Sequence, residues 1–136
     1  MTALLLLLAL QIPVTSDTML KDWRPDSAVA YDSVPVIYNQ WWEETQDCAG
    51  VKELKLSRIN WFSVKTIPIY VGFPCQGAYR CFGWWKARGH EVFIAHNQML
   101  NEYVIKHEML HEILWDENVE RKFMEHHKLF QKCGLS

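Results

Sequence analysis

Two histidines four residues apart, with a glutamate between them, are the residues of this chain whose types and spacing point most directly to chemistry. They form the segment HEMLH, His107 to His111, inside a run from Asn97 to Trp115 that lacks proline and glycine and is amphipathic. On a helix, residues four apart lie on one face, so both imidazoles can bind one metal ion. Glu108 can then accept a proton from a water on that ion. The spacing predicts a zinc centre of the hydrolase type.

A third zinc ligand is expected outside the motif, because a catalytic zinc ion takes three protein ligands and one water. The pattern with glycine three and histidine six residues after the motif is excluded, since Leu114 and Glu117 occupy those positions. The main candidates are His126 and His127, on a following helix that a short connection brings back across the metal helix. Adjacent helical residues point about 100° apart, so only one can face the zinc ion. Four nearby carboxylates stay open as alternatives: Asp116, Glu117, Glu120 and Glu125.

The four cysteines predict two disulfides. Cys75 and Cys81 enclose five residues around a glycine, which suits a short disulfide-closed loop better than a zinc-binding pair. Pairing them leaves Cys48 and Cys133 to close a loop of about 85 residues. This connectivity is one of three that four cysteines allow. An even set of cysteines indicates an oxidising compartment.

Residues 1–16 are predicted to be a signal peptide. They contain an apolar stretch of about ten residues, too short to span a membrane as a helix, and small and polar residues follow it. Cleavage is expected after Ser16. No lysine or arginine precedes the apolar stretch, so an N-terminal core helix is the alternative. The prediction is a secreted or periplasmic protein with no stable membrane insertion after signal removal.

Length and charge narrow the class of protein further. The 136 residues suffice for one domain, and the 14 basic and 16 acidic residues are interspersed. Without a basic cluster that could follow phosphates, nucleic acid is not an expected partner. The expected partner is a peptide or protein substrate, bound by a monomer. Seven tryptophans are expected mainly in the core or in a surface groove.

The order of predicted elements indicates an α+β fold. Residues 17–33 are polar and aperiodic, so we predict an extended N-terminal segment there, and residues 34–136 are predicted to form the domain. The expected elements of that domain are a helix at 36–49 with Ile37, Trp41 and Cys48 inward, strands at 58–65 and 67–71, a hairpin of strands 81–86 and 91–95, and helices at 97–115 and 118–132. A helix, a small mixed or antiparallel sheet, the metal helix and a closing helix make a minimal zincin-like layout. The strand at 91–95 is the expected edge strand, which could bind an extended peptide by strand addition.

Several short segments form a further pattern: Trp41-Trp42, Cys48-Ala49-Gly50, Trp61-Phe62, Cys75, Cys81 to Trp85, the HEMLH segment and Phe130-x-x-Cys133-Gly134-Leu135. In these residues the chain resembles a group of small secreted bacterial zincin-like metallopeptidases. The resemblance covers most of the chain after the signal and implies peptidase activity, without naming a substrate. When the family's closing segment His-Pro-x-x-Phe-x-x-Cys-Gly is aligned on Phe130 and Cys133, its histidine falls on His126. His127 replaces the proline, and the preceding loop is longer, so His127 stays as the alternative.

The predicted function is therefore that of a secreted zinc-dependent metallopeptidase. His107, His111 and His126 would bind Zn²⁺, and Glu108 would be the general base. One alternative is a non-catalytic secreted binding module stabilised by zinc, which a closed site with four ligands would indicate. Another is an immunity or inhibitor protein with an accidental motif, which would bind no zinc.

Two further groups of residues are assigned more loosely. A donor to the oxyanion is expected near the zinc ion, and the sequence offers Tyr79, Arg80 and Tyr103 without choosing among them. Glu112, next to the motif, is expected to face solvent or to orient an imidazole. His90 and His96 flank a strand and are expected to be structural or exposed rather than ligands.

Overall fold

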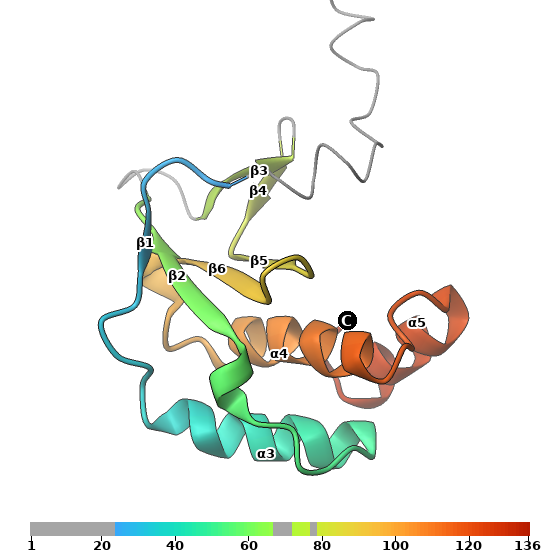
Figure 1. Ribbon diagram of the computed structural model, residues 1–136. Coiled ribbons are helices and arrows are strands. Elements are labelled where there is room, and N and C mark those ends of the chain that lie inside the picture. Colours follow the sequence, from blue (N-terminus) through green and yellow to red (C-terminus); the bar gives the residue numbers. More distant parts are fainter. Residues whose placement is uncertain (1–23, 67–71, 77–78) are drawn as a thin grey trace, which may run out of the picture.

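The structure, a computed structural model, describes residues 24–66, 72–76 and 79–136. These residues form an α+β fold, as the sequence predicts, with helices packed against a small mixed sheet (Figure 1). The predicted signal peptide at 1–16 and the predicted strand at 67–71 lie outside the described residues. Within the predicted extended segment 17–33, residues 28–30 form a short strand of the sheet.

The main sheet has four strands in the order β1-β2-β6-β5. Their bounds are Ala28–Ala30 for β1, Asn60–Val64 for β2, Gly83–Lys86 for β5 and Glu91–Ala95 for β6. β2 and β6 are parallel, while β1 pairs antiparallel with β2 and β5 pairs antiparallel with β6. The hairpin predicted around Gly89 is therefore present as β5 and β6.

The prediction that residues 91–95 form an edge strand is wrong, because β6 lies between β2 and β5. Every residue of β6 is buried. Val92 and Ile94 face the helices, whereas Phe93 and Ala95 face a second, smaller core on the other side of the sheet. Residues 92–95 form a continuous apolar run, which is typical of a strand covered on both faces. The edge strand beside β6 is β5.

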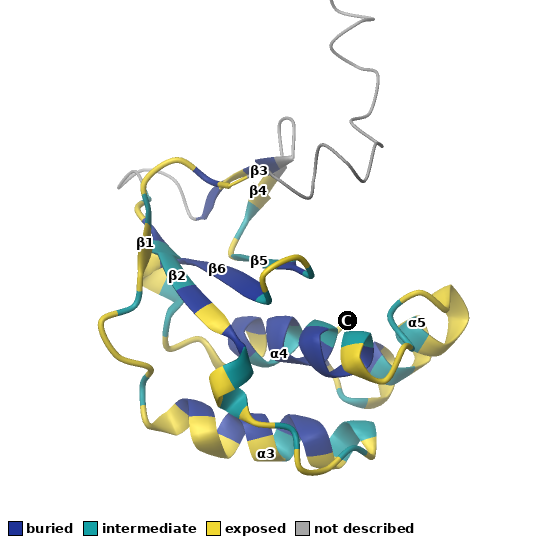
Figure 2. Cartoon of the chain, in the orientation of Figure 1, coloured by how far each residue is buried: buried dark blue, intermediate teal, exposed yellow. Residues whose placement is uncertain are grey.

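Helices α3 (Ile37–Ala49) and α4 (Glu102–Asp116) cover one face of the sheet (Figure 1). The inward stripe predicted for α3 is only partly right. Ile37 remains 36% exposed, and the buried side chains belong to Tyr38, Trp41, Trp42, Thr45 and Gln46. These residues recur with the helical period, and Figure 2 shows the buried side of α3 turned toward α4.

α4 and α5 (Phe123–Lys132) both begin later than predicted. Asn101, not Asn97, caps α4, because its side chain accepts a hydrogen bond from the backbone N–H of Val104 at 3.4 Å, and residues 96–98 form a separate 3-10 turn. Asn118, at φ 60°, has a left-handed backbone that a helix does not accommodate. The segment between the two helices is therefore a connection that folds back along α4.

The opposite face of the sheet is covered by a second, two-stranded sheet. β3 (Phe73–Gln76) and β4 (Tyr79–Cys81) are antiparallel and carry the Cys75–Cys81 disulfide. Phe73 and Cys75 are buried against Val64 and Phe93 of the main sheet. β4 is followed almost directly by β5, so the disulfide at Cys81 restrains the segment that precedes the edge strand.

The second disulfide joins Cys48, near the end of α3, to Cys133, just after α5. Both predicted pairs are therefore confirmed, and they fit a protein of an oxidising compartment. α5 packs behind α4 through Phe130, and Leu135 extends the same cluster. Among the residues that the structure describes, no helix combines the length and apolar character that crossing a membrane requires.

The two disulfides are expected to contribute unequally to stability. In the chain-entropy model a loop of about 85 residues is worth about 4.5 kcal/mol, and a loop of about six residues about 2 kcal/mol. Urea unfolding should therefore show that the free energy of unfolding falls more in the C48A/C133A variant than in the matched C75A/C81A variant. An equal or reversed order would mean that the longer disulfide does not act by restricting the unfolded chain.

Candidate metal centre

α4 places the two motif histidines on one face, one turn apart. The ring centroids of His107 and His111 lie 5.0 Å apart, with the rings edge to face. Both side chains are partly buried on the side of α4 that α5 covers. The predicted pairing of the two imidazoles is thus present in the structure.

Each motif imidazole has a hydrogen-bond partner at Nδ1. Nδ1 of His107 lies 2.5 Å from the carbonyl oxygen of Leu135, and Nδ1 of His111 lies 2.6 Å from Oε1 of Glu120. A carbonyl only accepts, so Nδ1–H of His107 donates, and an ionised Glu120 likewise accepts from His111. Each ring then keeps its lone pair on Nε2. Metal-binding histidines are commonly oriented in this way by an acceptor at the other nitrogen.

Burial keeps both motif histidines neutral near pH 7. It lowers the pKa of His111 to about 4. It also lowers the pKa of His107, with a further lowering from the nearby His111. Since a histidine must be deprotonated at one nitrogen to bind a metal ion, this environment favours ligation.

α5 brings His126, and not His127, to the motif. The ring of His126 lies 5.3 Å from that of His111, and its Nε2 lies 3.3 Å from Oε1 of Glu120. His127 is exposed and stacks on Phe123 at 6.1 Å. Of the two histidines between which the sequence left the choice open, only His126 lies beside the motif.

Glu120, in the connection between α4 and α5, lies between two of the imidazoles. The ligand atoms of His111, Glu120 and His126 all lie within 4.8 Å of one another. Oε2 of Glu120 is buried and has no hydrogen-bond partner among the described residues. Burial raises the pKa of this carboxyl to about 7, although His126 and His107 act in the opposite direction.

This donor set fits a zinc ion. Imidazole nitrogen and carboxylate oxygen are ligands that Zn²⁺ prefers, and a buried carboxylate oxygen without a partner is costly unless a cation or donor completes it. The other predicted carboxylate candidates do not join the group. Asp116 binds Arg58 at 2.7 Å, Glu125 pairs with Lys128 at 3.6 Å, and Glu117 is exposed.

Phe130 forms a common support beneath the imidazoles. Its ring centroid lies 4.8 Å from that of His107, 4.7 Å from that of His111 and 4.6 Å from that of His126. The side chain is only 3% exposed. Because a packed aromatic ring leaves its neighbours few rotamers, Phe130 limits how far the three imidazoles can turn.

Glu108 lies on a different side of α4, against the edge strand β5. A Cβ added to Gly83 would lie 2.9 Å from Oε1 of Glu108, so only glycine leaves room for the carboxylate there. The backbone N–H of Trp85 donates to the carboxylate. Burial, reinforced by the charge of Glu120, raises the pKa of Glu108 to about 8, despite that hydrogen bond. Sequence reasoning missed Gly83, although a glycine inside a strand is a sign of close backbone approach.

The structure distinguishes among the predicted oxyanion donors. Tyr103 lies beside the motif, with its ring 6.1 Å from that of His107, and its hydroxyl donates to the backbone carbonyl of Ser136. Arg80 donates to the carbonyl of Gly72 at 2.7 Å, within the hairpin region. Tyr103 is therefore the candidate with a contact to the motif; the side chain of Tyr79 lies outside the described part of the chain.

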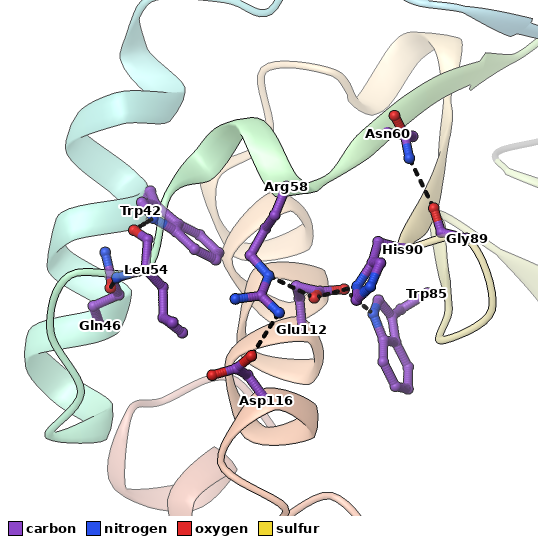
Figure 3. Close-up of polar contacts among 10 residues, drawn as sticks. All are labelled: Trp42, Gln46, Leu54, Arg58, Asn60, Trp85, Gly89, His90, Glu112 and Asp116. Carbon is purple, nitrogen blue, oxygen red and sulfur yellow. Dashed lines mark hydrogen bonds and ion pairs between the residues drawn. The ribbon is translucent and has the colours of Figure 1, made fainter.

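The prediction that Glu112 faces solvent is wrong, because its side chain is fully buried. Its carboxylate contacts neither imidazole of the motif directly. Three donors surround its carboxylate, from Arg58, Trp85 and His90 (Figure 3). No local pattern in the sequence indicated this cluster, because its members are brought together only by the fold.

Comparison of the chain with models of protein families, with curated proteins and with solved structures gives no match. The function is therefore inferred from the geometry of the residues themselves.

Proposed function

We propose that this protein is a secreted zinc-dependent metallopeptidase. The observation that supports the proposal best is the arrangement around α4. The imidazoles of His107, His111 and His126 surround one aromatic ring. Glu108 lies on an adjacent side of the same helix, buried against an edge strand. Metal ligands, a proton acceptor and a site for an extended substrate are what this reaction needs.

His107, His111 and His126 are the proposed zinc ligands. Two of them, His111 and His126, belong with Glu120 to the group whose ligand atoms lie within 4.8 Å of one another, and His107 lies one turn before His111 on α4. The Nδ1 contacts of the first two leave their Nε2 atoms for the metal ion. Glu120 would orient His111 from Nδ1 and add negative charge beside the metal ion, which supports binding of a divalent cation. The unpartnered Oε2 of Glu120 also makes it the alternative third ligand.

Glu108 is the proposed general base. When bound, zinc would lower the pKa of a coordinated water toward about 7 and polarise the carbonyl of the scissile bond. The positive charge of the bound zinc ion would lower the pKa of Glu108 from its raised value, so that the group is ionised. Its carboxylate would then accept the proton of that water and later pass it to the leaving amine. Glu108 is buried under β5, away from bulk water. The backbone N–H of Trp85 binds its carboxylate and holds it in one orientation.

β5 is the proposed binding edge for an extended peptide. As the edge strand of the sheet it lies directly over α4, where Gly83 contacts Glu108. A peptide added to this edge would run past the metal centre, with main-chain hydrogen bonds supplying affinity that depends little on sequence. We therefore propose that residues 83–86, and not residues 91–95, bind an extended peptide by strand addition.

A non-catalytic zinc-stabilised binding module is the second candidate, and the position of Glu120 favours it. If Glu120 binds the metal ion together with three histidines, four protein ligands close the site and leave no position for water. Such a protein would hold zinc as tightly as an enzyme but would hydrolyse nothing.

Hydrolysis of an unfolded protein separates the two candidates. The peptidase should cleave reduced, carboxymethylated casein, lose this activity in a chelator, and regain it when zinc is restored. The chelated protein should stay folded by circular dichroism, so that loss of activity reports the metal ion and not unfolding. A protein that binds zinc stoichiometrically but leaves the casein intact would be the binding module.

A further inference from the structure

Glu112 is the centre of a buried polar cluster that the proposed reaction does not use. Its side chain is 0% exposed. Nε of Arg58 donates to it at 3.0 Å, and Nε1 of Trp85 donates at 3.0 Å. Nδ1 of His90 lies 2.7 Å from the same carboxylate. Figure 3 shows these three side chains converging on Glu112 from three segments of the chain: the turn before β2, the edge strand β5 and the turn after it.

The donors around Glu112 are themselves held in place. Arg58 also binds Asp116, one turn along α4, at 2.7 Å. The turn that carries His90 is fixed by Asn60, whose side chain donates to the carbonyl of Gly89 at 2.8 Å and whose backbone N–H donates to the carbonyl of His90 at 2.8 Å. A buried carboxylate with several charge-assisted and neutral donors has one favourable orientation. Glu112 therefore fixes β5 relative to α4.

Trp85 connects this cluster to the metal centre. Its indole ring lies 5.4 Å from the ring of His111 with only 8° between the two planes, so the rings are stacked. Its backbone N–H binds the carboxylate of Glu108. One residue of the edge strand thus contacts a proposed ligand through its side chain and the proposed base through its backbone.

We propose that Glu112 and Trp85 act as a positioning pair for the metal centre. Glu112 holds the indole by its N–H, and the indole holds the imidazole of His111 in the orientation that presents Nε2 to the metal ion. Neither residue is a proposed metal ligand. The inference rests on the proposed function, since it takes His111 to be a zinc ligand, and it adds two residues that set the geometry of the site.

Zinc affinity in Trp85 variants tests the stacking. Trp85→Leu removes the aromatic plane and should weaken zinc binding by about 10- to 100-fold, the range seen when residues that orient ligands are lost. Trp85→Phe keeps an aromatic ring without the N–H, so its zinc affinity should lie between those of Trp85→Leu and wild type. The matched control is Trp84→Leu, the same change one residue earlier, in a side chain that packs on the other face of the sheet; it should stay within about twofold of wild type. Affinity is measured by competition with a chromophoric chelator.

Two variants of Glu112 separate positioning from stability. Glu112→Gln keeps an oxygen that can accept from Trp85 but places an amide N–H₂ against Arg58. It should lower the urea midpoint while keeping zinc affinity within about threefold of wild type. Glu112→Met matches the size of glutamate but accepts no hydrogen bond. It should therefore lower both the urea midpoint and the zinc affinity. If Glu112→Met does not fold, the Trp85 series decides.

The outcomes are distinguishable. Wild-type protein that binds no zinc contradicts the proposed function itself. Zinc binding that is as tight in Trp85→Leu as in wild type contradicts the positioning pair alone. Equal losses in Trp85→Leu and Trp84→Leu also contradict it, because they would show a general effect of losing a tryptophan from β5.

Discussion

Replacing Glu108 with glutamine should abolish hydrolysis while zinc stays bound. Glutamine has the shape of glutamate, so it fits beneath Gly83, and its oxygen can still accept from the backbone N–H of Trp85. It cannot accept a proton at neutral pH. General-base catalysis contributes about 10²- to 10⁴-fold to rate, so kcat/KM for a fluorogenic peptide should fall by at least that lower figure.

The matched control for Glu108→Gln is Glu117→Gln. Glu117 follows the same helix and is exposed, so the same chemical change there should leave both the rate and the zinc content unchanged. If the Glu108 variant cleaves the peptide as fast as wild type, Glu108 is not the base. If it loses its zinc, the carboxylate is needed for binding the metal ion rather than for proton transfer.

The second large effect is expected at His126. Its ring lies 5.3 Å from that of His111, while its neighbour His127 is exposed and stacks on Phe123. Removing a zinc ligand should cost more than removing a residue that only orients one, so His126→Ala should weaken zinc binding by more than about 100-fold. His127→Ala, the same change one residue later, should leave the affinity unchanged. Competition with a chelator measures both variants.

A variant of Glu120 completes this comparison. Glu120→Gln keeps a hydrogen-bond acceptor for Nδ1 of His111 but removes the charge, so we expect a loss of about 10- to 100-fold, smaller than that of His126→Ala. The reverse order would make Glu120 the third ligand and His126 its partner. Loss of zinc in His127→Ala with retention in His126→Ala would contradict the geometry of α5 described above.

The features predicted correctly from sequence are those encoded by local patterns. The HEMLH segment has helical spacing inside an apolar periodic run, and α4 carries it. The hairpin of β5 and β6 has a glycine in its turn, at φ 79°. Cys75 and Cys81 are close in sequence and pair, which leaves Cys48 and Cys133 as the second pair.

The features that the sequence could not provide depend on contacts between distant segments. β6 is an interior strand because β2 pairs with its far side in parallel, and no local pattern encodes that pairing. Glu112 is buried because Arg58, 54 residues away, and Trp85, 27 residues away, both reach it. The acceptor for His107 is a backbone carbonyl, that of Leu135, so no residue type could have indicated it.

The choice between His126 and His127 as the third ligand also depends on contacts between distant segments. Helical geometry predicted from sequence that only one of His126 and His127 could face the motif, because adjacent residues diverge by about 100°. Which one does so depends on the rotation of α5 about its axis. That rotation is fixed by Phe130, which is buried behind α4, and by the disulfide of Cys133.

Metal analysis of the purified protein tests the central claim most directly. After dialysis against metal-free buffer, inductively coupled plasma mass spectrometry should find one zinc ion per chain in wild type. It should find almost none in His111→Ala, since this histidine contacts both Glu120 and the stacked indole of Trp85. Wild-type protein without zinc after incubation with the metal, or equal zinc in wild type and His111→Ala, would contradict the metal centre on which the proposed function rests.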